Sequence, residues 1–236
     1  MKPIAIFQHH PGEGPGYFLQ FARQHQLPVR IYCSFLNEPL PATSRDYAGL
    51  VFMGGPMSVN DDLPWLHHEI RLIQEAMELD TPVLGHCLGA QLLAKAMGAH
   101  ISANQPADCE IGWHPVHPTH TQASQEWFGD TLGVEFMHWH SENFSIPERA
   151  VRLLSNEHCH NQAFASGKHL GMQFHLEMTE AMVQQWSEQQ EELTRWQHLP
   201  SVQNREQLLH RHTSRVAAIN RVADHVYGRW IQGLAH

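Results

Sequence analysis

Three residues of the chain, Cys87, His175 and Glu177, have the side-chain types that nucleophilic catalysis by sulfur requires. A thiolate attacks an acyl carbon, an imidazole moves the protons, and a carboxylate holds the imidazole in the required tautomer. His175 and Glu177 follow an apolar segment and are two positions apart, so in extended chain their side chains lie on one face. The pattern predicts covalent acyl chemistry at Cys87, against the alternative that this cysteine is a small core residue beside a strand.

Cys87 stands between two apolar segments of different length. Residues 82–84 predict a short buried strand, and residues 88–97 predict a helix that packs on the sheet. Gly85 and Gly89 flank the cysteine where a Cβ would obstruct a sharp strand-to-helix turn, the backbone pattern of a nucleophile elbow. Free N–H groups at the start of the helix would favour a thiolate over a thiol.

A second turn, Gly54-Gly55-Pro56, follows the strand predicted at residues 47–53. Open α/β sheets bind ligands beyond the carboxyl ends of their strands, and glycine lets a backbone N–H approach a developing oxyanion. Taken alone, the residues favour an ordinary tight turn here.

Three segments together resemble the motifs of the class I (triad-type) glutamine amidotransferases: residues 85–91, 54–56 and 171–177. Within that family the chain is most similar to the glutaminase domain of GMP synthase and its stand-alone relatives, from the first strand to about Glu177. The resemblance implies that Cys87, His175 and Glu177 hydrolyse the side-chain amide of L-glutamine to glutamate and ammonia. It implies no metal and no organic cofactor.

The resemblance also assigns substrate contacts to three residues. The backbone amides of Gly55 and Leu88 would be the two oxyanion donors, which makes a functional turn of the Gly-Gly-Pro segment. Gln91, on the first turn of the helix after the nucleophile, would contact glutamine.

Residues 137–142 are similar to the family segment Ser-His-Gly-Asp, which holds the α-amino and α-carboxylate groups of glutamine partly through its backbone. His140 matches this segment, Ser141 stands where glycine is usual, and Glu142 stands where aspartate is usual. Leu176 occupies a position that is typically proline. These departures affect the substrate contacts and remove no catalytic group.

The resemblance implies a separate synthetase subunit that receives the ammonia, because the chain carries no ATP-pyrophosphatase signature of the type S-G-G-x-D-S. A γ-glutamyl peptidase or hydrolase is the alternative enzyme, since the same triad cleaves γ-glutamyl amides with larger leaving groups. A regulatory or scaffold protein that keeps the fold without turnover is the alternative of another class. The presence of all three triad residues argues against it.

Composition narrows the class of protein. A chain of 236 residues buries a sizeable core without disulfides, and its four cysteines (Cys33, Cys87, Cys109 and Cys159) show no CxxC spacing. The formal charge of −9 and the lack of a Lys/Arg cluster argue against nucleic acid or an anionic membrane as a partner. Without a signal-peptide core or a membrane-spanning run, we predict a cytoplasmic protein.

Histidine is unusually abundant, with 21 residues, and pairs such as His9-His10 and the triplet His158-Cys159-His160 raise the question of a metal site. Adjacent side chains on a strand point to opposite faces, and the chain has no H-x-x-x-H helix with a third ligand nearby. The sequence therefore predicts no metal site.

The catalytic residues require a parallel sheet to position them, and the first half of the chain predicts one. Strands expected at 4–8, 29–33, 47–53 and 82–84 alternate with helices at 17–26, from 61–64 onward, and at 88–97. This alternation is typical of an open, mostly parallel, doubly wound (flavodoxin-like) α/β sheet with helices on both faces.

The second half changes character. Short β pieces are expected at 100–103, 112–117, 134–138, 151–155, 162–165 and 170–174, with one short helix at 125–129, so a smaller part should be antiparallel. Residues 179–236 form a C-terminal helical extension of a single domain, 1–236: a helix capped by Thr179, then a final helix over 202–227. We expect this extension to pack on the core of its own domain. An interface for a homodimer or for a synthetase subunit is the alternative role of these residues.

Overall fold

The centre of the molecule is a mixed eight-stranded sheet, seen in a computed structural model that describes residues 2–129, 131 and 133–234. Its strand order is β2-β1-β3-β4-β12-β11-β10-β7, and the first five of these strands are parallel. Their bounds are β1 Ile4–Gln8, β2 Val29–Cys33, β3 Gly49–Phe52, β4 Val83–His86, β7 His117–Pro118, β10 Val151–Ser155, β11 Ala163–Ser166 and β12 His169–Met172. β11, β10 and β7 continue the sheet in antiparallel pairing.

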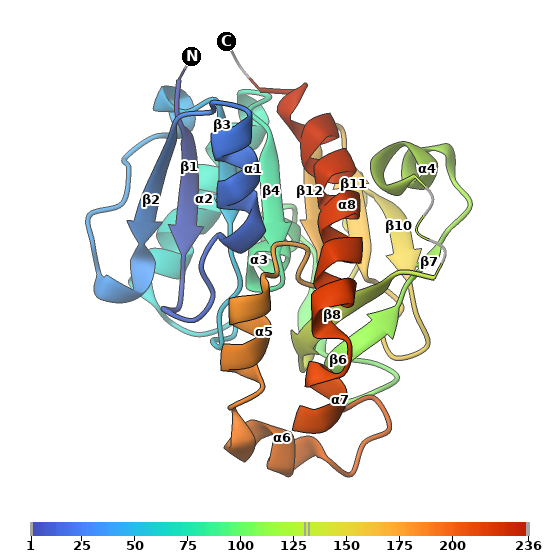
Figure 1. Ribbon diagram of the computed structural model, residues 1–236. Helices are drawn as coiled ribbons and strands as arrows, with labels where there is room; N and C mark the ends of the chain where they lie inside the picture. The colour runs from blue at the N-terminus through green and yellow to red at the C-terminus, as the bar shows by residue number, and fades with distance from the viewer. Residues whose placement is uncertain (1, 130, 132, 235–236) are drawn as a thin grey trace.

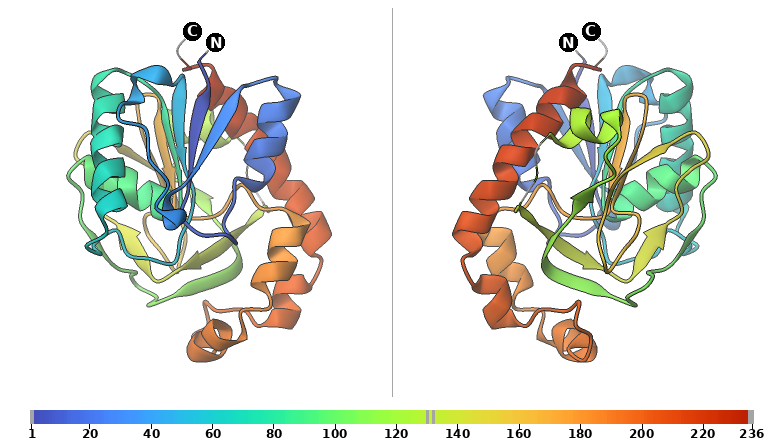
Figure 2. Two further views of the ribbon diagram at one scale, coloured as in Figure 1. Left: turned by 90° about the vertical axis from the view of Figure 1, so that its left-hand side faces the viewer. Right: turned by 90° about the vertical axis from the view of Figure 1, so that its right-hand side faces the viewer.

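Helices cover both faces of this sheet (Figures 1 and 2). On one face lie α1 (Gly16–Gln24), α4 (Gln122–Phe128) and α8 (His212–Ile231), and on the other lie α2 (Pro64–Glu78) and α3 (Leu88–Ala96). Successive residues of β1 alternate between the two cores: Ile4 and Ile6 pack against the first group of helices, Ala5 and Phe7 against the second. A strand buried on both sides must be apolar throughout. The fold confirms the predicted α/β class.

Two small antiparallel sheets flank the main one, as the β-rich second half predicted. β5 (Ile101–Ala103) pairs with β9 (Glu142–Phe144), and β6 (Glu110–Pro115) pairs with β8 (Glu135–His140). An isolated bridge joins Met137 of β8 to His175, just past the end of β12. This bridge places the segment around residue 140 beside the parallel strands. Two 3-10 turns, Ser34–Leu36 and Ser44–Asp46, complete the loops near β2 and β3.

The C-terminal region differs in detail from its prediction. After the Thr179 cap, whose hydroxyl accepts from the Met182 amide, two helices form in place of one: α5 (Glu180–Trp186) and α6 (Gln190–Trp196). The prediction of a single helix over 202–227 is wrong, because two helices form there. A capping box at Asn204 starts α7 (Arg205–Leu209), and the positive φ of Arg211 separates it from α8. Val216, Ile219, Ala223 and Val226, which recur at helical spacing, are buried on the inner side of α8.

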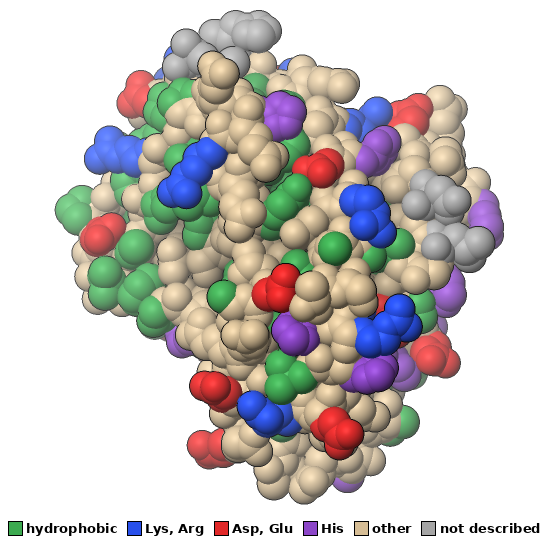
Figure 3. Space-filling view, viewed as in Figure 1, with side chains coloured by type: hydrophobic (Ala, Val, Ile, Leu, Met, Phe, Trp, Pro, Cys, Tyr) green, Lys and Arg blue, Asp and Glu red, His purple; other side chains and the backbone are tan. Residues whose placement is uncertain are grey.

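The long helix α8 shares a hydrophobic core with the main sheet, which fits the default expectation for this region. The helix expected at 125–129 begins earlier, at Gln122, because the Thr121 hydroxyl accepts from the Ser124 amide and caps it. In the described part of the chain, none of the helices has the length and apolarity needed to cross a bilayer. Lys and Arg side chains are scattered over the face shown in Figure 3.

Candidate active site

Cys87 occupies a sharp turn between β4 and α3. Its backbone has φ 49° and ψ −108°, a conformation that costs energy in a residue with a side chain and is found where surrounding structure enforces it. The Cys87 amide donates to Met172 O (2.8 Å) and the Gly89 amide donates to Met53 O (3.1 Å). A Cβ at Gly85 would overlap the backbone of Gly89, and a Cβ at Gly89 would overlap the carbonyl of Phe52. Both flanking glycines are therefore sterically required.

His175 and Glu177 lie just beyond β12, the strand next to β4. The Nδ1–H of His175 donates to Oε1 of Glu177 at 2.8 Å, and both side chains are almost completely buried. The other nitrogen, Nε2, has no hydrogen-bond partner among the described residues and is left for the neighbouring Cys87 sulfur. The structure thus brings the three predicted catalytic side chains together.

Charge balance in this group is set by burial and by the pairing of opposite charges. Burial would lower the pKa of His175, but the Glu177 carboxylate and the Cys87 sulfur raise it well above its ordinary value. For Glu177, burial is outweighed by His86 and His175, which lower the pKa of the carboxyl group. Burial raises the pKa of the Cys87 thiol, with His175 opposing it. Burial of the sulfur therefore acts against the two groups that favour a thiolate, His175 and the helix N-terminus.

A further layer of groups supports Glu177 from the side of the C-terminal helix. His86 Nε2 lies 3.7 Å from Glu177 Oε2 and 3.0 Å from the hydroxyl of Tyr227, which belongs to α8. Burial lowers the pKa of His86, which favours the neutral ring. The late helix α8 thus holds the His86 ring, which packs beside the carboxylate that orients His175.

A cavity of about 400 Å³ opens beside Cys87. One side is formed by loops at the ends of β1, β3 and β8, and the other by α5, α6 and the turn between them. Its lining includes Glu13, Gly55, Gln91, Ser141, Gln185, Trp186, Gln189 and Glu192. Residues after 179 therefore form part of the cavity wall, although the sequence had suggested that they exceed what a catalytic core needs.

The predicted substrate-binding residues do not all reach this cavity in the same way. Gly55 and Ser141 line it, as does Gln91, whose Nε2 donates to Glu142 O (3.0 Å) and to Gln173 Oε1 (3.2 Å). Leu88 follows Cys87 at the start of α3, and its side chain packs in the core.

His140 belongs to the cavity lining, but its imidazole turns away. Only 1% of its side chain is exposed, Nδ1 donates to Glu142 O (3.2 Å), and Nε2 lies 3.0 Å from Glu110 Oε2. The ring is thus a support of the cavity wall and does not point at a ligand in the cavity.

Comparison with known proteins places this architecture in a family. The family described as "Glutamine amidotransferase class-I" matches residues 22–186. The chain belongs to the class I glutamine amidotransferase family. It superimposes on the crystal structure of a glutamine amidotransferase from Methylobacillus flagellatus with a TM-score of 0.96 and 43% identity, over 100% of this chain and 96% of that one.

Two curated relatives extend the comparison. The glutamine amidotransferase-like protein YfeJ of Salmonella typhimurium is 30% identical over 182 residues, which cover 72% of this chain and 74% of YfeJ. The glutamine-hydrolysing GMP synthase of Bacillus licheniformis is 31% identical over 135 residues, 55% of this chain. The match spans only 24% of that GMP synthase, so the resemblance to it is to one part of a longer protein.

Two tryptophans of this amidotransferase shape the site and were not assigned to it from the sequence. The indole of Trp186 stands edge-on to the His175 ring, with 4.7 Å between ring centroids, and its Nε1 donates to Gly12 O (2.9 Å). Trp139 packs edge-on to Trp186, and its carbonyl accepts from the Cys87 thiol at 3.7 Å. The spacing of Trp186 with Val183 and Leu193 predicts only that its side chain is buried, and it does not predict which residue the indole contacts.

Glu13 is the least expected member of this amidotransferase site. A Cβ at Gly54 would overlap its Oε2 and lie 2.9 Å from His175 Cε1, so the carboxyl group and the catalytic ring both press on that glycine. Burial raises the pKa of Glu13 to about 7, with His175 opposing the rise. In the sequence, Glu13 stands in a glycine-rich segment, residues 10–16, whose composition indicates only a tight turn before the next helix.

This carboxyl group makes the stability of the fold pH-dependent. Its pKa is above the ordinary 4.5, so its contribution to stability is fully present below pH 4.5 and is lost as pH rises through about 7. A glutamine side chain at position 13 is neutral at every pH, so Glu13→Gln removes this loss of stability at high pH. We expect thermal unfolding to give similar midpoints for variant and parent at pH 5, and a higher midpoint for the variant at pH 8. Glu126→Gln, which alters an exposed pair with Arg229, is the control, and a pH-independent difference for Glu13→Gln would contradict the assignment.

Proposed function

We propose that this amidotransferase hydrolyses the side-chain amide of L-glutamine to glutamate and ammonia, with Cys87, His175 and Glu177 as the catalytic residues. The observation that carries the proposal is the position of Cys87. It sits on a strained turn at the wall of a cavity, beside an imidazole whose other nitrogen is held by a buried carboxylate. Such a set of groups performs acyl transfer.

In the first half of the reaction, the thiol proton passes to Nε2 of His175 as the sulfur bonds to the amide carbon. The amides of Gly55 and Leu88 would receive the developing oxyanion, and neither donates a backbone hydrogen bond to another described residue. His175 then returns the proton to the leaving nitrogen, the C–N bond breaks, and ammonia departs from a γ-glutamyl thioester.

In the second half, His175 takes a proton from a water that attacks the thioester. Collapse of this intermediate breaks the C–S bond, releases glutamate and returns the proton to the sulfur. Glu177 keeps Nδ1 protonated throughout, so Nε2 stays the nitrogen that exchanges protons. No step of this reaction needs a cofactor.

The two ends of glutamine would be held by different groups. Among the described residues that line the cavity there is no Lys or Arg, which leaves backbone amides, the Ser141 hydroxyl and the Gln91 amide for the α-carboxylate. The carboxyl groups of Glu13, Glu142 and Glu192 also line the cavity and would be available to the α-amino group. His140 would act indirectly, by fixing the backbone of Ser141 and Glu142 from behind.

A γ-glutamyl amide hydrolase is a second candidate, because the cavity of about 400 Å³ is roofed by α5 and α6 and extends past Cys87 as far as Glu192. A leaving group larger than ammonia would occupy that extension. Product analysis with glutamine and with γ-glutamyl peptides separates the two activities.

The ammonia acceptor would be bound by a separate synthetase subunit in the cytoplasm. An affinity pull-down with this chain, followed by glutaminase assays with and without the captured protein, tests the partnership. A dimer of this chain is the alternative assembly, and measurement of its mass in solution distinguishes the two.

Covalent labelling tests the nucleophile directly. A glutamine-derived diazoketone is expected to alkylate Cys87, since it alone of the four cysteines lines the cavity, while Cys33, Cys109 and Cys159 stay unmodified. Mass spectrometry of the digested protein locates the label, and excess glutamine should slow its appearance. Label on another cysteine, or none at Cys87, would overturn the proposal.

A further inference from the structure

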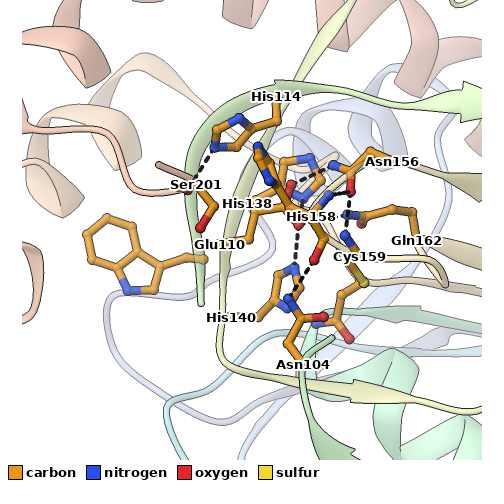
Figure 4. A network of polar contacts seen from close by, with 12 residues as sticks. Asn104, Glu110, His114, His138, His140, Asn156, His158, Cys159, Gln162 and Ser201 are labelled. Carbon is orange, nitrogen blue, oxygen red and sulfur yellow. Dashed lines mark hydrogen bonds and ion pairs between the residues drawn. The ribbon is translucent and has the colours of Figure 1, made fainter. Parts of the chain in front are cut away.

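A second cluster of ligand-type side chains lies behind the cavity wall, outside the catalytic group (Figure 4). Glu110 of β6 and His140 of β8 are paired across the small sheet, His138 is two residues before His140 on the same face, and Cys159 comes from the loop after β10. One ligand atom each of Glu110, His140 and Cys159 lies within 4.8 Å of the others. All four side chains are buried.

The hydrogen bonds of His140 require a positive charge beside its Nε2. A backbone carbonyl only accepts, so Nδ1 must carry the proton that is shared with Glu142 O. In the neutral ring, Nε2 is then a bare lone pair, and it faces the carboxylate oxygen Oε2 of Glu110 at 3.0 Å. Two acceptors cannot meet at this distance unless a proton or a metal ion lies between them.

His138 favours the metal ion. Its ring is completely buried, and neither Nδ1 nor Nε2 has a hydrogen-bond partner among the described residues. Nδ1 is 3.4 Å from the same oxygen of Glu110. Burial of an imidazole that has no hydrogen-bond partner costs free energy. Coordination of a metal ion would give the lone pair of this ring a partner.

The surroundings suit two anionic ligands. Asn156 Nδ2 (2.5 Å) and Gln162 Nε2 (2.8 Å) donate to Glu110, and Asn143 Nδ2 donates to the Cys159 sulfur (2.6 Å). Such outer donors orient metal-bound carboxylates and thiolates. A divalent ion between one carboxylate, one thiolate and two neutral imidazoles has no net charge, as a buried site requires.

We propose that Glu110, His138, His140 and Cys159 form a binding site for Zn²⁺. Zn²⁺ accepts Cys sulfur, His nitrogen and carboxylate oxygen as ligands, and it is four-coordinate and tetrahedral in closed sites. Zinc–ligand bonds of about 2.0–2.3 Å place neighbouring ligand atoms roughly 3.3–3.8 Å apart. The ligand atoms of Glu110, His140 and Cys159 lie within 4.8 Å of one another, so they would close by up to about 1 Å. His138 is outside this group of three but lies 3.4 Å from Glu110 Oε2, and its ring would turn toward the ion to complete the set. Trp139 lies between His138 and His140 in the chain, lines the cavity and contacts the Cys87 sulfur through its carbonyl. An ion bound to both histidines would therefore also hold this part of the cavity wall in place.

This site departs from the sequence-based expectation of no metal. Adjacent histidines such as His9 and His10 gave no metal site, because neighbouring side chains point to opposite faces of a strand. His138 and His140 are two apart and share a face, and the remaining ligands come from distant segments. Only the folded chain brings them together.

Metal content and cobalt spectroscopy test the proposal without reference to glutaminase activity. The untagged chain, purified from zinc-supplemented medium, is expected to carry about one zinc per molecule by elemental analysis. Refolding or exchange with Co²⁺ should produce the near-ultraviolet absorption of a thiolate–cobalt bond. Cys159→Ser should lose that absorption, and Glu110→Gln should reduce the zinc content at least tenfold. Cys33→Ser, at a cysteine outside the cluster, should retain both.

Two results would overturn the proposal. The first is a parent protein that carries no zinc and shows no thiolate–cobalt absorption after loading, a measurement that does not depend on whether any variant folds. The second is full zinc content in both folded variants, Cys159→Ser and Glu110→Gln, which would place the ion elsewhere.

Discussion

Replacement of Cys87 by alanine is expected to lower the turnover of glutamine by at least about four orders of magnitude while the chain stays folded. The sulfur is the atom that bonds to the substrate, and no other side chain at the turn can replace it. Structurally the change is small. Besides its contact with the His175 ring, the Cys87 sulfur makes two long hydrogen bonds, to Trp139 O (3.7 Å) and from Gln173 Nε2 (3.6 Å), and alanine meets the same backbone constraint.

Ammonia release from glutamine measures the effect, and circular dichroism with thermal unfolding monitors the fold. Cys109→Ala is a matched control, since this cysteine is equally buried but packs in the core away from the cavity. Parent and variants are assayed both alone and with any synthetase partner, because amidotransferase subunits without their partner have low basal rates. Turnover by Cys87→Ala equal to that of the parent would refute the nucleophile assignment.

The parts of this site that sequence reasoning could find are those held by local backbone geometry. The turn at Cys87 needs glycine at positions 85 and 89 because backbone atoms approach there, so the requirement is visible as residue types at fixed spacing. The pairing of His175 and Glu177 was expected from the two-residue period of extended chain, and the two side chains do pair, although both residues lie beyond β12. The parallel half of the sheet was predictable because buried strands carry short apolar runs, as residues 4–7 do in β1.

The parts that it could not find depend on contacts between distant segments. Glu13 follows β1, yet it meets the catalytic ring only because the loop passes Gly54. Tyr227 reaches His86 across 141 positions, through a helix whose start is set by the positive φ of Arg211. A motif predicts that His140 is near the substrate, but the direction of its ring depends on Glu110, a partner from another strand.

Replacement of Glu177 by glutamine is expected to lower turnover by about three to four orders of magnitude, although the two side chains have nearly the same shape. The carboxylate accepts the Nδ1 proton of His175 at 2.8 Å and thereby presents Nε2 to the sulfur. A glutamine amide that turns its NH₂ group toward Nδ1 forces the opposite tautomer, in which Nε2 already carries a proton and cannot take the one from the thiol.

Glu177→Gln also removes a negative charge, which should change the pH dependence of kcat/KM. Simple damage to the fold would lower the rate without shifting this pH dependence. Glu177 is the chief group that raises the pKa of His175, so the pKa of the ring should fall in Glu177→Gln. The acidic limb of kcat/KM, which reports the Cys87–His175 pair, is then expected to move to lower pH. Glu126→Gln, which removes an exposed carboxylate paired with Arg229, should keep both the rate and the acidic limb of the parent. If Glu177→Gln retains turnover within tenfold of the parent and its acidic limb does not move, the carboxylate does not orient the base, and the hydrogen bond to Nδ1 is only structural.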